Sequence, residues 1–195
     1  MLNSKQLSLG LFALLFSLAL PARAADAPAG PAKAADANPI VVMQVSHEGK
    51  PLGKILMKLF PQEAPESTKN FLKLINNKFY DGLTFHRIAD LDGSSPSRIV
   101  QGGDPKGDGT GGPGWNIKGE FLNNHVNNPL KHNAGALAMA RSGDPNSAGS
   151  QFYICVNPVH FLDGNYAVFG QVISGLDVAA KIQQGDKMTS VTVKK

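Results

Sequence analysis

The chain has 195 residues, and 19 lysines and arginines against 15 acidic residues give it a formal net charge of +4. The basic residues form no run or stripe of the kind that binds a phosphate backbone, so we expect no nucleic-acid partner. A single cysteine, Cys155, cannot form a disulfide within the chain. The stability of the fold must therefore come from a hydrophobic core, and the chain is long enough for one domain.

The first 24 residues have the pattern of a secretory signal peptide. Lys5 supplies a positive start, residues 7–20 are mostly apolar, and Ala22-Arg23-Ala24 offers small residues at a cleavage point. The apolar run is shorter than the roughly 20 residues that a membrane-spanning helix needs, so we expect cleavage and no stable membrane anchor. Cleavage removes two basic residues and no acidic one, which lowers the net charge from +4 to +2.

Residues 25–38 contain no large apolar side chain and cannot bury enough surface to order themselves, so we expect a flexible Ala/Pro tether. The composition changes at Ile40, and we place one folded domain over residues 39–195. Residues 40–45 and 54–60 are rich in apolar and β-branched side chains and flank a turn-rich segment. They predict a β-hairpin.

Residues 61–77 predict a helix. Pro65 is tolerated in a first turn, and Glu63 and Glu66 favour the N-terminal end. A second, shorter helix is predicted over residues 174–184, where it ends before Gly185. The side chains that recur at helical spacing in the first helix, and that should lie on a sheet, are Thr68, Phe71, Leu72 and Ile75.

The remaining apolar segments are short and are separated by Gly, Asn, Asp and Pro. They cover residues 135–140, 152–156, 166–172 and 190–193. Strands at this spacing predict an antiparallel barrel or a sandwich, and the spacing alone does not distinguish the two.

Several motifs suggest other chemistry and are interpreted more simply. Residues 107–112 match the G-x-G-x-x-G pattern of dinucleotide binding, but Pro113-Gly114-Trp115 follows where a helix should open, so a surface loop is expected. The five histidines show no close ligand pair, and we expect neither a metal nor another cofactor. Ser150 lacks a nucleophile-elbow context, and Cys155, between Ile154 and Val156, is interpreted as a small buried apolar residue.

Three short segments carry the functional signal: Phe85-His86-Arg87, Gln101-Gly102-Gly103-Asp104 and Ser150-Gln151-Phe152-Tyr153. They place one permanent cation and one amide side chain among aromatic residues, without a paired acid, nucleophile or metal cluster. An arginine cannot act as a base near neutral pH, so its role is hydrogen bonding. This combination suits a reaction that breaks no covalent bond.

These segments, with Gly109-Thr110-Gly111-Gly112, Leu162-Asp163-Gly164 and Val168-Phe169-Gly170, resemble the cyclophilins in order and near spacing, from about residue 41 to the C-terminus. Cyclophilins are peptidyl-prolyl cis/trans isomerases. The resemblance implies a mainly β fold, a closed eight-stranded antiparallel barrel capped by two α-helices. It also implies proline-containing polypeptides as partners.

The resemblance further implies roles for individual residues. Arg87 would be the catalytic donor, and Gln101 would hydrogen-bond the substrate backbone and help to orient it. Ile99, Tyr153 and Leu162 would enclose the proline ring. By resemblance, His86 would flank Arg87, and Phe152 would also bind substrate. Ala140 and Arg141 would meet the residues before proline, and Phe161 and Tyr166 would line the mouth of the pocket.

The chain departs from the family pattern at four places. Residues 89–98 replace a shorter link, so the usual pocket Phe is missing or displaced and Arg98 falls nearest its position. Tyr153 adds a hydroxyl where Phe is common, which would lower proline affinity or admit a water. Phe161 stands where cyclosporin-sensitive members carry Trp, and Tyr166 where many carry His, so we expect weak cyclosporin binding.

Two functions therefore follow from the sequence. The first is an isomerase that acts on X-Pro bonds of unfolded or newly exported proteins, a step slow enough to limit folding. The alternative is a proline-binding chaperone or scaffold with little catalysis, suggested by the altered link. We expect a monomer in the bacterial periplasm, with a secretory lumen as the alternative, because the signal is short and the chain ends Val193-Lys194-Lys195 without a retention motif.

Overall fold

The computed structural model describes residues 38–91 and 97–194. The predicted signal peptide, nearly all of the predicted tether, and residues 92–96 of the altered link lie outside the described residues. Within the described part of the chain, no helix is both long enough and apolar enough to cross a membrane.

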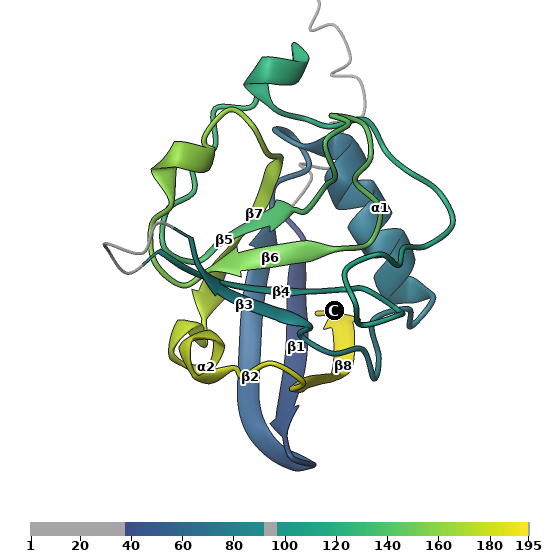
Figure 1. Ribbon diagram of the computed structural model, residues 1–195, viewed down its shortest axis with the longest axis vertical. Coiled ribbons are helices and arrows are strands. Elements are labelled where there is room, and N and C mark those ends of the chain that lie inside the picture. Colours follow the sequence, from purple (N-terminus) through teal and green to yellow (C-terminus); the bar gives the residue numbers. More distant parts are fainter. Residues whose placement is uncertain (1–37, 92–96, 195) are drawn as a thin grey trace, which may run out of the picture. The chain divides into compact units, whose positions relative to one another are not determined.

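The described residues form one eight-stranded antiparallel sheet and two α-helices (Figure 1), so the predicted fold class is confirmed. The strand order in the sheet is β3-β4-β6-β5-β7-β2-β1-β8. The elements are β1 (Ile40–His47), β2 (Lys50–Leu59), α1 (Pro65–Asn76), β3 (Arg87–Asp90), β4 (Arg98–Gly102), β5 (Ala136–Met139), β6 (Phe152–Cys155), β7 (Val168–Ser174), α2 (Leu176–Lys181) and β8 (Lys187–Val193).

The sheet curls until its two end strands, β3 and β8, approach each other. The chain just before β3 bonds to the chain around the start of β8: the Gly82 amide donates to the Met188 carbonyl at 2.7 Å, and the Phe85 amide donates to the Asp186 carbonyl at 2.8 Å. Closure of the predicted barrel therefore depends on this short bridge rather than on a full ladder between β3 and β8.

The two faces of the curled sheet bury different apolar clusters, because successive side chains of a strand point to opposite faces. The inner cluster includes Phe152 and Ile154 of β6, together with Val100 of β4. The outer cluster takes the alternate residues Tyr153 and Cys155. Cys155 is fully buried, as predicted, and burial raises the pKa of its thiol to about 12, so it stays protonated and unreactive.

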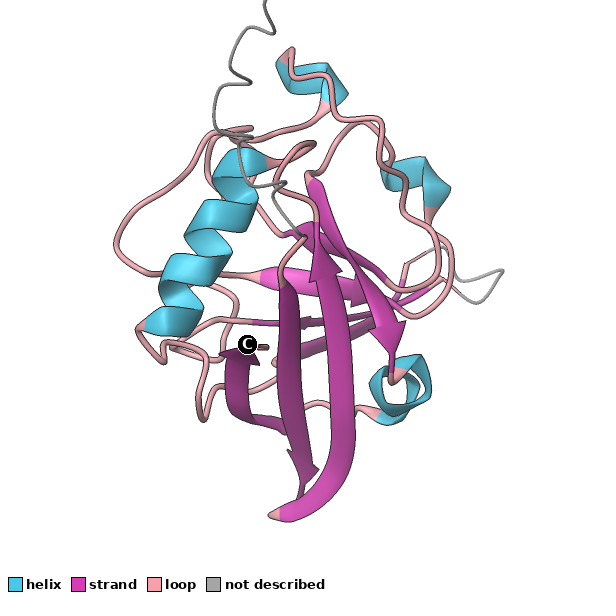
Figure 2. Cartoon of the chain, turned by 180° about the vertical axis from the view of Figure 1, so that it is seen from behind, coloured by secondary structure: helices cyan, strands magenta, loops and turns pink. Residues whose placement is uncertain are grey.

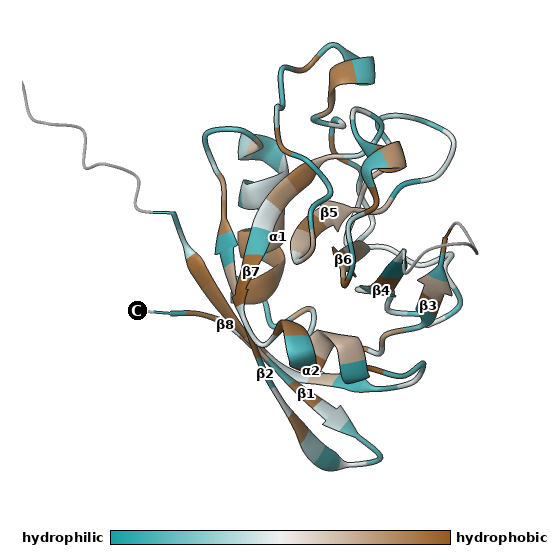
Figure 3. Cartoon of the chain, turned by 90° about the vertical axis from the view of Figure 1, so that its left-hand side faces the viewer, coloured by the Kyte–Doolittle hydropathy of each residue, from teal (hydrophilic) through white to brown (hydrophobic). Residues whose placement is uncertain are grey.

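The two helices cover different parts of the sheet. α1 packs against β7 and β8, and α2 packs against β2 (Figures 2 and 3). α1 begins four residues later than predicted, because a turn precedes Pro65. α2 is shorter than residues 174–184 at both ends and starts after Gly175, whose φ of +86° favours glycine.

The N-terminal end of α1 is capped by a residue far away in the sequence. The Glu120 carboxylate is buried and accepts hydrogen bonds from the Glu66 amide at 2.9 Å, the Ser67 amide at 2.8 Å and the Ser67 hydroxyl at 2.7 Å. The first amides of a helix otherwise lack partners, and a negative charge is favourable at this end. Glu120 thus fastens α1 to the loop that follows β4.

We expect the isosteric change Glu120→Gln to lower the free energy of unfolding by about 1–3 kcal/mol, because an amide NH₂ group would face an amide donor and leave it unpaired. Urea denaturation measures this loss. The matched change Glu48→Gln, at an exposed turn between β1 and β2, should alter stability by less than about 0.5 kcal/mol. Equal effects of the two substitutions would contradict the capping role.

Candidate active site

Three predicted site residues lie in one row across neighbouring strands. Arg87 of β3 is directly opposite Gln101 of β4, and Gln101 is directly opposite Tyr153 of β6. Opposite residues of an antiparallel pair project from the same face. The register therefore brings together on the outer face three side chains that are up to 66 positions apart in the chain.

A chain of hydrogen bonds orients the arginine. Arg87 Nη1 donates to Gln101 Oε1 at 3.0 Å, and Gln101 Nε2 donates to Gln151 Oε1, also at 3.0 Å. Gln151 Nε2 in turn donates to the carbonyl oxygens of Gly109 and Gly111, both at 2.9 Å. The side-chain amides of Gln101 and Gln151 can then each have only one orientation, so the side-chain oxygen of Gln101 faces the Arg87 guanidinium.

The glycine-rich loop at residues 107–112 anchors this chain of bonds. The Asp104 carboxylate accepts the amide hydrogens of Lys106 at 2.8 Å, Asp108 at 3.1 Å and Gly109 at 2.5 Å. Burial raises the pKa of Asp104, but the Lys106, Gly109 and Gly111 amides and the nearby His86 outweigh burial and leave the pKa below its usual value. The loop is exposed, as predicted, and it presents its carbonyl groups to Gln151.

A hollow of about 580 Å³ opens beside Arg87. Its lining includes four residues that were not predicted to belong to the site, Leu91, Asp108, Gly109 and Gln184. Ten of the eleven predicted site residues line it: His86, Arg87, Ile99, Gln101, Ala140, Arg141, Tyr153, Phe161, Leu162 and Tyr166.

Phe152 is the predicted site residue that the structure places elsewhere. It is fully buried in the inner cluster, where its ring lies 5.3 Å from Phe71 and 5.5 Å from Tyr80 between centroids. Because Tyr153 projects to the outer face, its neighbour Phe152 must project inward. The assignment of Phe152 to substrate binding was therefore wrong.

The altered link between β3 and β4 supplies a pocket residue that the sequence did not reveal. Arg98 does not line the hollow, because its guanidinium turns away and Nη2 donates to the Ile182 carbonyl at 2.9 Å. Leu91, just after β3, lines the hollow together with Ile99 and packs in the outer cluster. The link thus contributes an aliphatic side chain to the pocket wall.

Two further residues of the hollow are His86 and Arg141. Burial lowers the pKa of His86; Asp104 partly offsets this and the Arg87 cation adds to it, so His86 is neutral at pH 7. Arg141 donates through Nε and Nη2 to the Asn165 carbonyl at 3.1 and 2.9 Å, and its guanidinium lies 4.6 Å from the centre of the Tyr166 ring. Arg141 therefore braces the mouth of the hollow.

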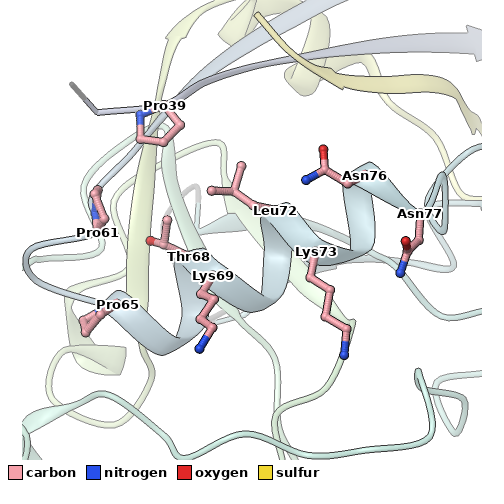
Figure 4. A pocket seen from close by; sticks show the side chains of 9 residues that line it. All are labelled: Pro39, Pro61, Pro65, Thr68, Lys69, Leu72, Lys73, Asn76 and Asn77. Atoms are coloured by element: carbon pink, nitrogen blue, oxygen red, sulfur yellow. The ribbon is translucent and has the colours of Figure 1, made fainter. Parts of the chain in front are cut away.

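Another hollow, of about 590 Å³, lies between α1 and the chain at Pro39 and Pro61 (Figure 4) and is lined by Pro39, Pro61, Pro65, Thr68, Lys69, Leu72, Lys73, Asn76 and Asn77. It holds none of the predicted site residues and no acid, histidine or aromatic side chain. Across the described residues, no three His, Cys, Asp or Glu side chains gather where they could hold a metal ion. The hollow beside Arg87 is therefore the candidate active site, with both polar and apolar walls and a cationic donor at its rim.

Comparisons with known proteins identify the family of this chain. The model of the family "Cyclophilin type peptidyl-prolyl cis-trans isomerase/CLD" matches residues 40–195. Peptidyl-prolyl cis-trans isomerase B of Bacillus subtilis is 47% identical over 140 residues, covering 72% of this chain and 90% of the relative. A peptidyl-prolyl cis-trans isomerase of Synechococcus elongatus is 42% identical over 143 residues, covering 72% and 90%.

A solved structure has the same fold. The crystal structure of a cyclophilin-type isomerase of Cryptosporidium parvum superposes with a TM-score of 0.67 at 27% identity, covering 81% of this chain and 98% of that chain. A second structure of that protein, determined in the presence of the dipeptide Ala-Pro, gives a TM-score of 0.66. The fold and the family match thus define the class of protein, an enzyme that acts on X-Pro peptide bonds.

The chain belongs to the cyclophilin-type peptidyl-prolyl cis-trans isomerases. Its activity is the cis/trans isomerisation of peptide bonds that precede proline. Membership of the family favours the enzyme over the alternative of a proline-binding scaffold with little catalysis.

Several residues of this region were not predicted to belong to the site. Gln151 was noted within a motif but was given no role, and Leu91 and Gln184 were not singled out. The only signal for Gln151 was its place between Ser150 and Phe152 in the motif. No local pattern could have placed Gln184, which reaches the hollow from the loop after α2.

Proposed function

We propose that Arg87 and Gln101 are the catalytic residues. Resonance gives the peptide bond a rotational barrier of about 18–20 kcal/mol, and twisting the bond restores a lone pair on the prolyl nitrogen. A donor at that nitrogen binds the twisted state better than the planar one, which is the kind of binding that accelerates a reaction. The observation that carries the proposal is the hydrogen-bond chain from the glycine-rich loop through Gln151 and Gln101 to Arg87.

The surrounding residues would then hold the substrate. Ile99, Leu162 and the Tyr153 ring would enclose the proline, since apolar walls with a few fixed polar groups suit small rigid ligands. Residues before proline would extend past Ala140 and Arg141 into an adjoining hollow of about 620 Å³, which shares both residues with the proline pocket. The side chains of His86, Phe161 and Tyr166 would complete the rim.

The proposed substrates are X-Pro bonds of unfolded or newly exported polypeptides in a bacterial periplasm. The support is the signal-peptide pattern of the first 24 residues, with its positive start, apolar run and small residues near Ala24. Uncatalysed isomerisation takes tens to hundreds of seconds, so newly exported chains gain from an isomerase.

Export is tested by producing the full chain in a Gram-negative bacterium. We expect the periplasmic fraction to contain protein whose mass corresponds to cleavage after Ala24, because the apolar run directs secretion. The variant Leu14→Arg interrupts this run and should leave uncleaved protein in the cytoplasm. Full-length wild-type protein confined to the cytoplasm would contradict export while leaving the isomerase activity intact.

Cyclosporin should inhibit the enzyme only weakly. Phe161 is 55% exposed at the rim and has no indole N–H to donate, unlike the Trp of sensitive family members. We expect no inhibition at nanomolar cyclosporin in an isomerase assay, and the variant Phe161→Trp should bind about three- to tenfold tighter, the equivalent of one added hydrogen bond. Nanomolar inhibition of the wild-type enzyme would refute this expectation.

A further inference from the structure

A fully buried histidine lies directly behind the proline pocket. His132 has no exposed surface, and its two ring nitrogens face two different partners. Nδ1 lies 2.9 Å from Asp163 Oδ1, and Nε2 lies 2.9 Å from the Tyr153 hydroxyl. The His132 and Tyr153 rings are nearly parallel, with an angle of 11° between their planes. The three side chains form a continuous line from a carboxylate to the pocket wall.

The partners determine where each proton lies. Asp163 is held by the His132 amide at 2.8 Å and lies 3.2 Å from His160 Nδ1 and 3.8 Å from Lys131 Nζ. Burial raises the pKa of Asp163, but its hydrogen bonds to His132 and His160 leave the pKa below its usual value, so the carboxylate only accepts. His132 Nδ1 therefore carries a hydrogen.

The second ring nitrogen of His132 is then free to accept. Burial lowers the pKa of His132 more than Asp163 raises it, so the ring is neutral at pH 7 and Nε2 carries no hydrogen. The Tyr153 hydroxyl must donate to that nitrogen. The hydroxyl proton of Tyr153 therefore points away from the hollow, and only the Tyr153 ring faces the hollow.

This arrangement joins two walls of the pocket. Tyr153 is only 3% exposed, lines the hollow and meets the Tyr166 ring edge-on, with centroids 6.0 Å apart. Leu162, next to Asp163, lines the hollow as well. One carboxylate thus fixes the loop that carries Leu162 and, through His132, the orientation of the Tyr153 side chain.

We propose that His132 and Asp163 are positioning residues for proline binding, which hold the Tyr153 hydroxyl outside the pocket so that its ring presents an apolar wall. The proposal rests on the proposed function, in which the hollow beside Arg87 binds proline. It also changes the expectation for Tyr153: with its hydroxyl bonded behind the wall, the tyrosine presents to proline the same surface as a phenylalanine.

The test is a double-mutant cycle between His132 and Tyr153. His132→Leu leaves the hydroxyl without a partner, so water must enter beside the pocket wall, and we expect KM for an Ala-Pro peptide to rise about tenfold with kcat within twofold. On the Tyr153→Phe background the same replacement should raise KM less than twofold, because no hydroxyl remains to be placed. His132→Gln, whose amide can bridge the same partners, should restore most of the affinity.

The outcomes separate the inference from the function on which it rests. Equal KM effects of His132→Leu on both backgrounds, or a loss of thermal stability with KM unchanged, would overturn the positioning role. Arg87→Ala is measured in parallel: if it is fully active, the proposed site itself fails. ¹⁵N NMR of the wild-type protein needs no variant to fold, and a hydrogen on His132 Nε2 rather than Nδ1 would overturn the inference.

Discussion

Replacing Arg87 with alanine should lower kcat/KM for an Ala-Pro peptide by about 100- to 1,000-fold, the effect of removing one preorganised donor from a charge-stabilising site. Arg87 is exposed and its bond to Gln101 lies on the surface, so the fold should be unchanged. The proposed hydrogen bond from Arg87 to the prolyl nitrogen strengthens as that nitrogen regains its lone pair. The loss should therefore fall on kcat, while KM changes little.

The measurement is NMR exchange between the cis and trans forms of the peptide, which needs no coupling protease. Arg87→Lys keeps the charge but loses the planar fork that meets Gln101, and it should fall between wild type and Arg87→Ala. Lys181→Ala, which removes an exposed cation on α2, should have full activity. Exchange catalysed equally by Arg87→Ala and the wild type would remove the arginine from the mechanism.

The sequence located six of the eight strands and missed the two that carry Arg87 and Gln101. β1, β2, β5, β6, β7 and β8 are rich in apolar and β-branched residues, so their patterns were visible. β3 has the sequence Arg-Ile-Ala-Asp and β4 Arg-Ile-Val-Gln-Gly, and their polar residues hide the pattern. Residues of the site alternate with residues of the core along these strands. The functional side chains that reveal the family therefore also hide the apolar pattern by which a strand is predicted.

The site was predictable where residues belong to contiguous motifs and unpredictable where it depends on distant chain segments. Motif order identified ten residues of the hollow, whereas Phe152 was misassigned because a motif does not say which face of a strand each residue occupies. Leu91 lines the hollow, whereas Arg98 turns to the Ile182 carbonyl, 84 positions further along the chain. Such long-range contacts have no local sequence signal.

Replacing Phe71 with alanine should cause the largest loss of stability. Phe71 is fully buried on α1, and its ring lies 5.0 Å from Tyr80, 5.3 Å from Phe152 and 5.1 Å from Phe169 between centroids. It therefore joins the helix to both β6 and β7. Removing a buried phenylalanine costs about 3–5 kcal/mol, because apolar contacts are lost and a cavity remains. For a domain of this size the melting temperature should fall by roughly 10 °C.

Calorimetry and urea denaturation measure this loss, and Leu122→Ala, at a side chain that is 61% exposed, is the control and should change stability by less than about 0.5 kcal/mol. Phe71 packs on the inner face, whereas the proposed site lies on the outer face, so at 25 °C the folded variant should isomerise an Ala-Pro peptide at nearly the wild-type rate. This is the reverse of Arg87→Ala, which should lose activity and keep its stability. If Phe71→Ala lost activity while its melting temperature was unchanged, the assignment of stability to the inner face and of activity to the outer face would be wrong.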